Sequence, residues 1–591
     1  MHGLWYNNIV KLFDIKFGNN LEGAEELFVK GGEYCAADGS LTLKAGESAS
    51  FETYFNLFPH PEYAEYCGIK SVFLELKAQG RYRIDFFEQR KSGKMLLKSY
   101  IAEGDCAAEC NLTGAHEGGY TYFTLTAESD CSFYRGAWVA AKAPERRVKI
   151  AVVICTYNRE QYVRANVMRV ATTMDADPDR KELIHLYIID NAGNLELESG
   201  DFYTVVRNRN LGGAGGFARG MYEAAKDKSF THILLMDDDI YFDFSTLDRT
   251  CRLLGALTEK HKNASVGGAM LVMDKPYIQY EFGGYFDGLI FRSLNHKLDV
   301  RRTESLLKNQ NAPKPNYNAW WYCCMPASCV KEHGLPMPFF IKSDDVEYGM
   351  RAMDELILTS GLAVWHQDFG AKYTGTLEYY IKRNGAVAAA LRMPTGSLKA
   401  AIRYAYFMFK NLSLKNYDCV ELIYKAYLDF RAGSNFFLTA DSADLNDEIR
   451  AHAQKFTDEA ELAKVCGKKP ELPEVRREKR HSLAACFLMF AENYMPAFLF
   501  SKKVGVTNAG IPRAWDCFMK KTVVHYDPYN GKGLVLKLDT KRRRKLRRLT
   551  YKVFFGLLFN YGKIKKDYRK NWQKMCSEEN WCRMFFKNIQ N

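Results

Sequence analysis

Short apolar segments alternate with helical patterns in the middle of the chain, and this alternation constrains the fold more than any other feature. The unbroken apolar run at 148–154 is typical of a strand buried on both faces. Further strand patterns occur at 184–189, 203–207 and 232–236, with helical patterns from about Arg159 and over 216–226. Strands that alternate with helices predict an α/β sheet with crossover connections.

Polar or glycine-rich residues follow each of these predicted strands. They are Thr156-Tyr-Asn-Arg159, Asp190-Asn191, the segment from Asn208 to Gly213, and Asp237-Asp-Asp239. In open α/β sheets the ligand lies beyond the carboxyl ends of the strands. We therefore expect these side chains to converge on one site.

The flanking regions have different patterns, and 591 residues are too many for one ordinary core. Period-two alternation at 71–77, 82–87 and 120–126 predicts half-buried strands, and hence an N-terminal β-sandwich. We predict a multidomain α/β protein. Its domains are the sandwich at 1–145, a Rossmann-like α/β catalytic domain at 148–385, and a mostly helical, basic domain at 386–591.

The N-terminus lacks the features of a signal peptide, and no stretch has the pattern of a membrane span. The best candidate, 483–500, is interrupted by Glu492, Asn493 and Pro496. The 16 cysteines show no disulfide framework, which favours reduced thiols. We expect a cytoplasmic protein.

The formal net charge is +13, and the densest basic run is Lys541–Arg548. An apolar, aromatic-rich stretch follows at 549–559, a pattern that fits an interfacial helix on anionic lipid. The alternative is a basic helix packed on the body by its apolar face. Nucleic acid is the least favoured partner, because the stretch lacks a recognisable binding module. An oligomer contact is also possible.

The triple aspartate Asp237-Asp-Asp239 closes an apolar strand. Adjacent carboxylates repel each other unless a cation is present. Alternate residues of an extended segment project to one side, so Asp237 and Asp239 can share one ion, and their oxygens suit Mn²⁺ or Mg²⁺. The competing interpretation is a solvated acidic turn. His366, after another short apolar segment, could complete the metal shell or be a hydrogen-bonded core histidine.

Two further acids, Asp344 and Asp345, open a predicted helix at 345–355. Ser343 is a natural N-cap, and acids in the first turn favour the helix dipole, so capping alone could explain them. The functional alternative is a general base that deprotonates an acceptor hydroxyl. The neighbouring rings of Trp320 and Trp321 are either core or a platform for an acceptor sugar.

The segment Asn210-Leu-Gly-Gly-Ala-Gly-Gly216 lacks the G-x-G-x-x-G spacing, so it gives weak support for nicotinamide binding. Glycines before a helix allow backbone N–H groups to approach phosphate or sugar oxygens. The alternative is a tight strand-to-helix turn.

Taken together, the ordered set of motifs resembles family-2 inverting glycosyltransferases with the GT-A fold. The set comprises the four strand-end segments, Trp320-Trp321, Asp344-Asp345-x-Glu347 and Trp365-His366. More narrowly, it is similar to the bacterial galactofuranosyltransferases that polymerise cell-wall galactan, which have a β-sandwich, a GT-A domain and a helical region.

The resemblance implies a role for each motif. Asp345 would be the catalytic base with Asp344 beside it, and Asp237, Asp239 and His366 would hold the metal. The acceptor site would include Trp320, Trp321 and Glu347. The uridine diphosphate sugar would contact Thr156, Asn158, Arg159, Asp190, Asn210, Gly212, Gly213, Arg219 and Asp238.

We therefore predict metal-dependent, inverting transfer of a sugar, with galactofuranose favoured over others such as rhamnose. The acceptor would be a growing glycan on a lipid carrier, with the enzyme peripheral at the inner face of the cell membrane. A non-catalytic carbohydrate-binding protein and a nucleotidyltransferase are the alternatives. Three carboxylates at a strand end argue against pure binding.

Overall fold

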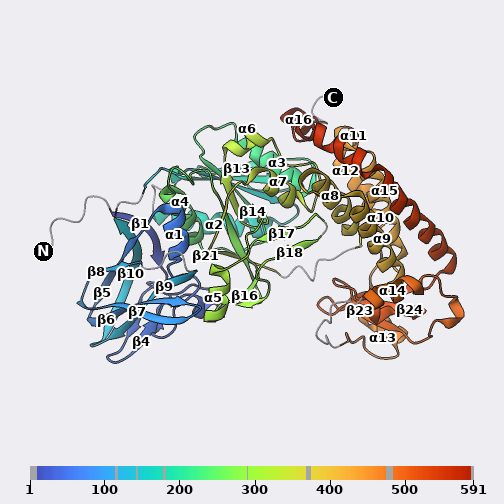
Figure 1. The fold of residues 1–591 in the computed structure, drawn as a ribbon. Helices are drawn as coiled ribbons and strands as arrows, with labels where there is room; N and C mark the ends of the chain where they lie inside the picture. The colour runs from blue at the N-terminus through green and yellow to red at the C-terminus, as the bar shows by residue number, and fades with distance from the viewer. Residues whose placement is uncertain are drawn as a thin grey trace.

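The computed structural model describes residues 9–112, 118–141, 144–176, 181–288, 290–367, 375–473 and 483–587. Three regions follow one another along the long axis of the molecule: a β-sandwich, a central α/β region, and a C-terminal region rich in helices (Figure 1). This architecture agrees with the predicted multidomain α/β fold.

Two antiparallel sheets form the N-terminal sandwich. Alternate residues of its strands are buried, as in β5, because each sheet packs only one face on the other. The first sheet has the order β2 (Glu33–Tyr34), β3 (Leu41–Leu43), β10 (Cys131–Ala141), β5 (Ser71–Gln79) and β8 (Cys106–Asn111), with β1 (Ile9–Ile15) also on β10. The second has the order β4 (Ser48–Ser50), β9 (Gly119–Ala127), β6 (Arg81–Arg90) and β7 (Gly93–Glu103).

The central sheet has nine strands, and its parallel half carries the polar strand ends. There β13 (Tyr203–Arg207), β12 (Ile184–Asp190), β11 (Ile150–Thr156) and β14 (His232–Asp237) lie side by side. The sheet continues with β20 (Cys323–Pro326), antiparallel to β14, and then β15 (Ser265–Val272), β16 (Lys275–Glu281) and β19 (Leu298–Asp299), with β21 (Leu356–His366) parallel to β15. The adjacent Cys323 and Cys324 are thus interior strand residues.

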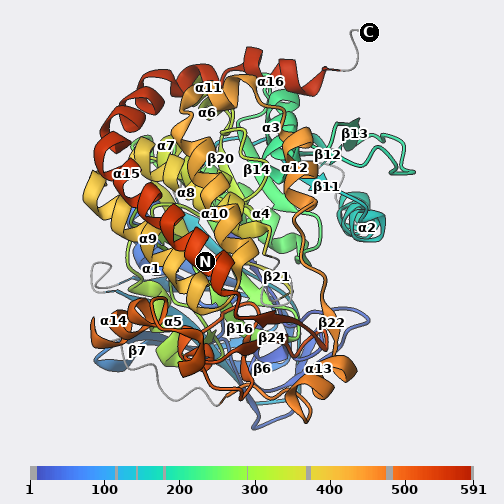
Figure 2. The ribbon, with the colours of Figure 1, turned by 90° about the vertical axis from the view of Figure 1, so that its right-hand side faces the viewer.

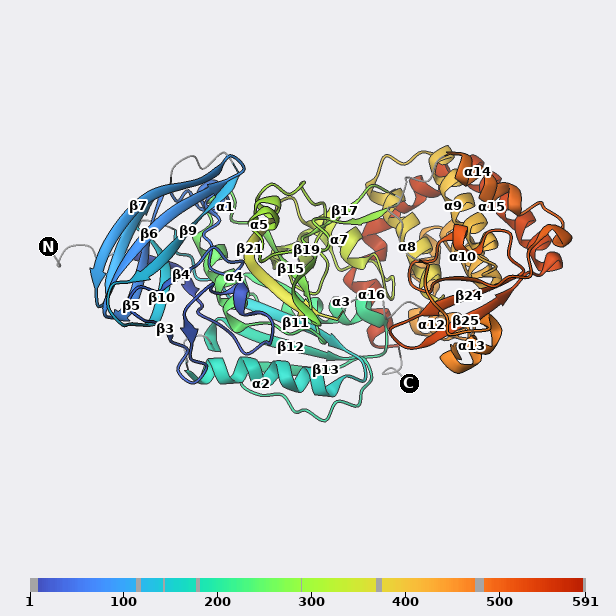
Figure 3. The same cartoon turned by 90° about the horizontal axis from the view of Figure 1, so that it is seen from below.

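Helices flank this sheet: α2 (Glu160–Ala176), which lies alongside β12 and β13 (Figure 3), α3 (Gly212–Ala224) and α4 (Phe244–Ala256). Helix α3 begins at Gly212, four residues earlier than the sequence predicts. A Cβ atom at Gly216 would lie 2.0 Å from Sγ of Cys155, and one at Gly220 would lie 2.1 Å from Val153. Close packing on β11 therefore requires these glycines and outweighs their low helix propensity.

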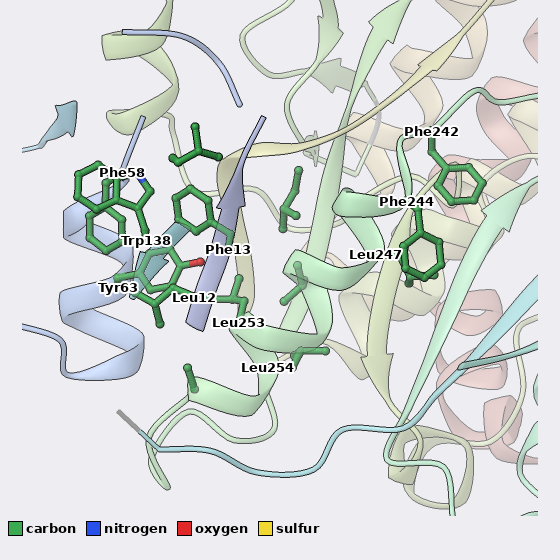
Figure 4. Packing of buried hydrophobic residues seen from close by; sticks show 14 of the residues in the cluster. Leu12, Phe13, Phe58, Tyr63, Trp138, Phe242, Phe244, Leu247, Leu253 and Leu254 are labelled. Atoms are coloured by element: carbon green, nitrogen blue, oxygen red, sulfur yellow. The ribbon is translucent and has the colours of Figure 1, made fainter. Parts of the chain in front are cut away.

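The sandwich packs on α4 through a continuous apolar core. Phe13, Phe58 and Trp138 gather beside Leu253 and Leu254 (Figure 4), and all five side chains are buried. Such packing gives the sandwich and the catalytic region one shared core.

The C-terminal region begins with α8 (Leu377–Arg392), α9 (Ser397–Ser413) and α10 (Tyr417–Arg431). It continues with α11 (Ser434–Thr439), α12 (Ser442–Arg450), α13 (Glu459–Cys466) and α14 (Leu483–Glu492), and ends with α15 (Thr540–Met575) and α16 (Glu578–Phe585). Helix α15 packs across α8, α9 and α10 (Figure 2). A four-stranded sheet, which the sequence analysis did not predict, joins β22 (Thr457–Asp458), β25 (Lys532–Lys537), β24 (Thr522–Asp527) and β23 (Gly505–Asn508).

Within the described part of the chain, no helix combines the length and the apolar character needed to cross a bilayer. The cysteines whose thiols the structure places in that part form no disulfide bonds with one another.

Candidate active site

A cavity of about 450 Å³ opens at the carboxyl ends of the parallel strands. The ends of β11 and β14 form one side of it, and the first turn of α3 contributes to its wall. Helices α8 and α12 of the C-terminal region line the remainder through Tyr380, Asn446, Ile449 and Arg450. The site is therefore built from two regions of the chain, with its chemistry where open α/β sheets bind ligands.

Asp238, the middle residue of the triple aspartate, is held by neighbours from β11. Its Oδ2 accepts a hydrogen bond of 2.7 Å from Thr156 Oγ1, and its Oδ1 lies 3.0 Å from Arg159 Nη1. The same Nη1 lies 2.8 Å from Oδ2 of Asp239. Burial raises the pKa of Asp238 to about 6 against the opposing effect of Arg159. Arg159 thus draws the ends of β11 and β14 together.

Asp237, Asp239 and His366 form a compact group at the end of β14. One ligand atom from each lies within 4.8 Å of the others. Nε2 of His366 lies 3.1 Å from Asp239 Oδ1, and Nδ1 makes a 2.5 Å hydrogen bond with the carbonyl of Gln367. Burial raises the pKa of Asp237, although His366 opposes this. Burial is the largest single influence on the pKa of His366 and acts to lower it, but the hydrogen bond and charge of Asp239, together with the charge of Asp237, outweigh burial and raise that pKa.

These three residues fit a divalent metal ion. Two carboxylates and one imidazole are a donor set that Mn²⁺ or Mg²⁺ accepts. The hydrogen bond from Nδ1 of His366 to a backbone carbonyl directs Nε2 toward the aspartates, the arrangement that metal-bound histidines usually have. A cation would also relieve the repulsion between two buried carboxylates.

A strained turn presents Asp344 and Asp345 at the start of α7 (Asp344–Ala352). Phe340, Lys342 and Ser343 all have left-handed backbones, with φ of 74°, 68° and 67°. Three such residues so close together require support from the surrounding structure and are typical of functional sites. Ser343 occupies the N-cap position, as predicted, but its side chain makes no capping hydrogen bond. Tertiary packing sets this helix start.

Burial raises the pKa of Asp344 and of Asp345, and the charge of Asp345 raises that of Asp344 further. Oδ1 of Asp345 accepts a 2.8 Å hydrogen bond from the N–H of Val346. A carboxylate with a raised pKa is a stronger base than an ordinary aspartate. The pair therefore has the electrostatics that general base catalysis requires.

Sequence reasoning missed two residues near Asp345. They are Glu281 and Tyr317. Burial raises the pKa of Glu281 to about 8, and the charge of Asp345 adds to this rise. Burial also raises the pKa of Tyr317, and the charge of Asp345 contributes there too. Glu281 ends β16, and no described residue bonds its Oε1. A lone glutamate at a strand end gives no sequence signal.

The glycine-rich segment follows a strand of the parallel half, as the sequence predicts, and it lines the cavity. Oδ1 of Asn210 accepts a 3.2 Å hydrogen bond from the N–H of Gly212, and Asn210, Gly212 and Gly213 all line the cavity. Gly212 has φ of 71°, and a Cβ there would lie 2.1 Å from the carbonyl oxygen of Phe340. The close approach of these two loops explains the need for glycine.

Asn158 and Asp190 lie at the correct strand ends but do not line this cavity. Oδ1 of Asn158 accepts a 2.9 Å hydrogen bond from Asn194. The buried carboxylate of Asp190 accepts backbone N–H groups of Ala192, Gly193 and Leu195, which shapes the loop after β12. Their predicted nucleotide contacts stay predictions.

Arg219 lies about two turns into α3, where its Nε binds Glu223 at 2.8 Å and its guanidinium packs over Phe585 and Phe586. It does not line the cavity, and its predicted contact with the donor stays a prediction.

The predicted acceptor residues are buried in this structure. Trp320 and Trp321 are 4% and 5% exposed, and Trp321 Nε1 donates to the carbonyl of Gly268 at 3.0 Å. Glu347 is fully buried and binds Arg351 at 2.9 Å and Arg392 at 2.9 Å. Burial acts to raise the pKa of Glu347, but the charges and hydrogen bonds of the two arginines outweigh it and lower that pKa. The ion pairs give Glu347 a structural task, and acceptor contact by the tryptophans stays a prediction.

Comparison with known families defines the class of this protein as a glycosyltransferase. Residues 146–386 match the model of the family "Glycosyltransferase like family 2", and residues 30–141 match "Galactofuranosyltransferase 2 N-terminal". With a GT-A catalytic domain and named transferase relatives, the chain is a glycosyltransferase, so the binding-only and nucleotidyltransferase alternatives are set aside.

Among known proteins, the chain is similar to the galactofuranosyltransferase GlfT2 of Mycolicibacterium smegmatis, at 28% identity over 74% of this chain and 72% of the relative. It is also similar to GlfT2 of Mycobacterium tuberculosis, at 28% identity over 67% of each chain. A mannosyltransferase from Pyrobaculum calidifontis in complex with GDP-Man and Mn²⁺ matches over 52% of this chain and 82% of that one, at 13% identity. The TM-score of this match is 0.27.

Proposed function

We propose that this protein is a metal-dependent, inverting galactofuranosyltransferase that extends a lipid-linked glycan from a UDP-sugar donor. The observation that carries the proposal is the ligand group of Asp237, Asp239 and His366 beside a cavity at the carboxyl ends of the parallel strands. The buried Asp344 and the half-buried Asp345 supply a separate acidic centre.

In this proposal Asp345 accepts the proton of an acceptor hydroxyl. The hydroxyl oxygen forms a bond with the anomeric carbon of the donor sugar on the face opposite the diphosphate. The bond between that carbon and the diphosphate oxygen breaks, and its electron pair leaves with the nucleoside diphosphate. Attack from the opposite face inverts the anomeric configuration.

Asp237, Asp239 and His366 would hold the divalent ion. When bound, such an ion neutralises charge on a diphosphate leaving group. Arg159 keeps Asp238 and Asp239 in place, and Thr156 fixes the other oxygen of Asp238. The protein therefore presents preorganised carboxylates that would fix such an ion where negative charge develops on the leaving group.

The choice of galactofuranose rests on the relatives, which are named galactofuranosyltransferases, and a donor such as UDP-rhamnose is the alternative. The test is incubation of the purified chain with Mn²⁺, a galactan oligosaccharide acceptor and a panel of nucleotide sugars, with products detected by mass spectrometry. Extension with UDP-galactofuranose alone is expected. Extension with another donor would reassign the sugar and leave the transferase class intact.

The proposed attachment to a membrane is based on helix α15, which has one face packed on the protein and one exposed face. One face packs on the body through residues such as Leu546, Val553 and Leu557. On the other, Phe555 and Phe559 are 50% and 76% exposed and stack on each other. An apolar groove of about 330 Å³ connects this face with α9 and α14, where it is lined by Phe409, Met489 and Phe490.

The basic residues of the run Lys541–Arg548 fall into two groups. Some bind other parts of the protein, and others are exposed. Arg542 binds Asp418 and Glu421, and Arg543 donates to the carbonyl of Met495. Arg544, Lys545 and Arg548 are exposed, near the exposed aromatic face. Basic side chains around apolar ones fit a surface of anionic lipid. This arrangement supports attachment at the cytoplasmic face of a membrane, where a lipid-linked acceptor would lie.

A further inference from the structure

Helix α12 is part of the donor cavity although it lies in the C-terminal region. Asn446, Ile449 and Arg450 are three or four residues apart, so they share one face of the helix, and all three line the cavity. Ile449 packs with Phe340 and Tyr380 in one apolar cluster, and Oδ1 of Asn446 accepts a 3.3 Å hydrogen bond from the Tyr380 hydroxyl. The helix is therefore fixed against the loop that precedes Asp344.

The other end of α12 is joined to the glycine-rich segment. Asp441 caps the helix and binds both terminal nitrogens of Arg209, at 3.1 and 3.2 Å, while Lys587 binds it at 2.9 Å. Arg209 directly precedes Asn210 at the cavity wall. Charge-assisted, bidentate pairs of this kind fix the relative orientation of the two side chains and also stabilise their contact. Because both of its ends have partners at the site, α12 is a fixed wall of the cavity.

Arg450 differs from the other cation that lines the cavity. Arg159 is already engaged by Asp238 and Asp239. Arg450 is exposed at the cavity and forms no ion pair with any residue that the structure describes. In the same part of the chain, no group accepts a hydrogen bond from Nδ2 of Asn446, which is 8% exposed. The α12 wall thus offers a guanidinium and an amide donor to an anion in the cavity.

We propose that Arg450 binds the diphosphate of the nucleotide donor from the α12 wall, with Asn446 donating a hydrogen bond beside it. The inference rests on the proposed function for the presence of a nucleotide in this cavity. Guanidinium groups bind phosphate oxygens through paired, charge-assisted hydrogen bonds. The C-terminal region therefore completes the donor site, and the catalytic domain alone lacks one of its phosphate ligands.

The test is equilibrium binding of UDP and of uridine to the full chain in Mg²⁺, measured by calorimetry. Three variants are compared: Arg450→Ala, Arg450→Lys, and the matched control Arg431→Ala, which removes an exposed arginine of α10 that does not line the cavity. Arg450→Ala is expected to weaken UDP binding about tenfold and to leave uridine binding unchanged. Arg450→Lys should retain part of the affinity, and the control should match the native chain.

If Arg450→Ala binds UDP within about twofold of the native chain, Arg450 is only a solvated side chain and the inference is wrong. An equal loss for UDP and uridine would show a distorted cavity and also overturn it. Failure of the proposed function looks different, because the native chain would then bind no UDP. Binding of GDP in its place, weakened by Arg450→Ala, would retain the inference and reassign only the base.

Discussion

The imidazole of His366 lies 3.1 Å from the carboxylate of Asp239, although His366 ends β21 and Asp239 follows a different strand, β14. With Asp237 they form the only group of at least three metal-binding side chains found among the described residues. His366 therefore connects the triple aspartate with β21 in the other half of the sheet.

Replacement of Asp239 by alanine should abolish metal-dependent stabilisation by UDP. The variant loses a ligand shared with Asp237 and His366, while Arg159 keeps Asp238 as a partner. Thermal unfolding with UDP should show an upward shift on addition of Mn²⁺ in the native chain only. Asp274→Ala, an exposed aspartate between β15 and β16, is the control. Full transferase activity in excess chelator would contradict the metal assignment.

Replacement of Asp345 by asparagine should lower the transfer rate by at least about 10²-fold, because the amide cannot accept the acceptor's proton. UDP binding should be retained. In the native chain the rate should fall as pH falls through the raised pKa of Asp345, since only the ionised carboxylate is a base. Single-turnover rates across pH test both points. Near-normal turnover by the variant would leave Asp345 with a structural task alone.

Replacement of Asp344 by asparagine should stabilise the fold at high pH. Because burial raises its folded pKa, ionisation costs stability above the unfolded pKa of about 4. The variant should gain about 1–3 kcal/mol at pH 8 and nothing below about pH 4. Urea unfolding at both values measures this. The exposed Asp354 after the same helix, changed to asparagine, should have no effect at either pH.

Neutralisation of Arg544, Lys545 and Arg548 to glutamine should reduce binding to anionic vesicles. Each basic residue near such a surface contributes about 1 kcal/mol, and salt screens the attraction. Co-sedimentation at low and high salt provides the measurement.

A matched set of exposed sandwich lysines, Lys44, Lys70 and Lys91, should have no effect when changed to glutamine. Phe559→Ser should weaken attachment at either salt concentration, because it removes apolar contact. Should the native chain ignore anionic vesicles at low salt, the exposed face of α15 is an oligomer contact or only a structural surface.

Local pattern was enough to predict three strands of the sandwich, β5, β6 and β9, and the parallel half of the central sheet. Buried parallel strands are apolar runs, whereas apolar and polar residues alternate in sandwich strands. The strands β11, β12, β13 and β14 are therefore evident from the local sequence pattern. The acidic residues at the end of β14 were recognisable for the same reason, since a charged cluster after an apolar strand conflicts with burial unless it has a function.

Tertiary structure alone decided which of these residues meet. Arg219 and Glu347 stand in motifs typical of the site, but packing gives them the partners Glu223, Arg351 and Arg392 instead. Asn446 and Arg450 lie far along the chain in an ordinary amphipathic helix, and their place at the cavity depends on how α12 packs. Sequence periodicity specifies an element and its buried face, whereas contacts between distant elements depend on the complementarity of whole surfaces.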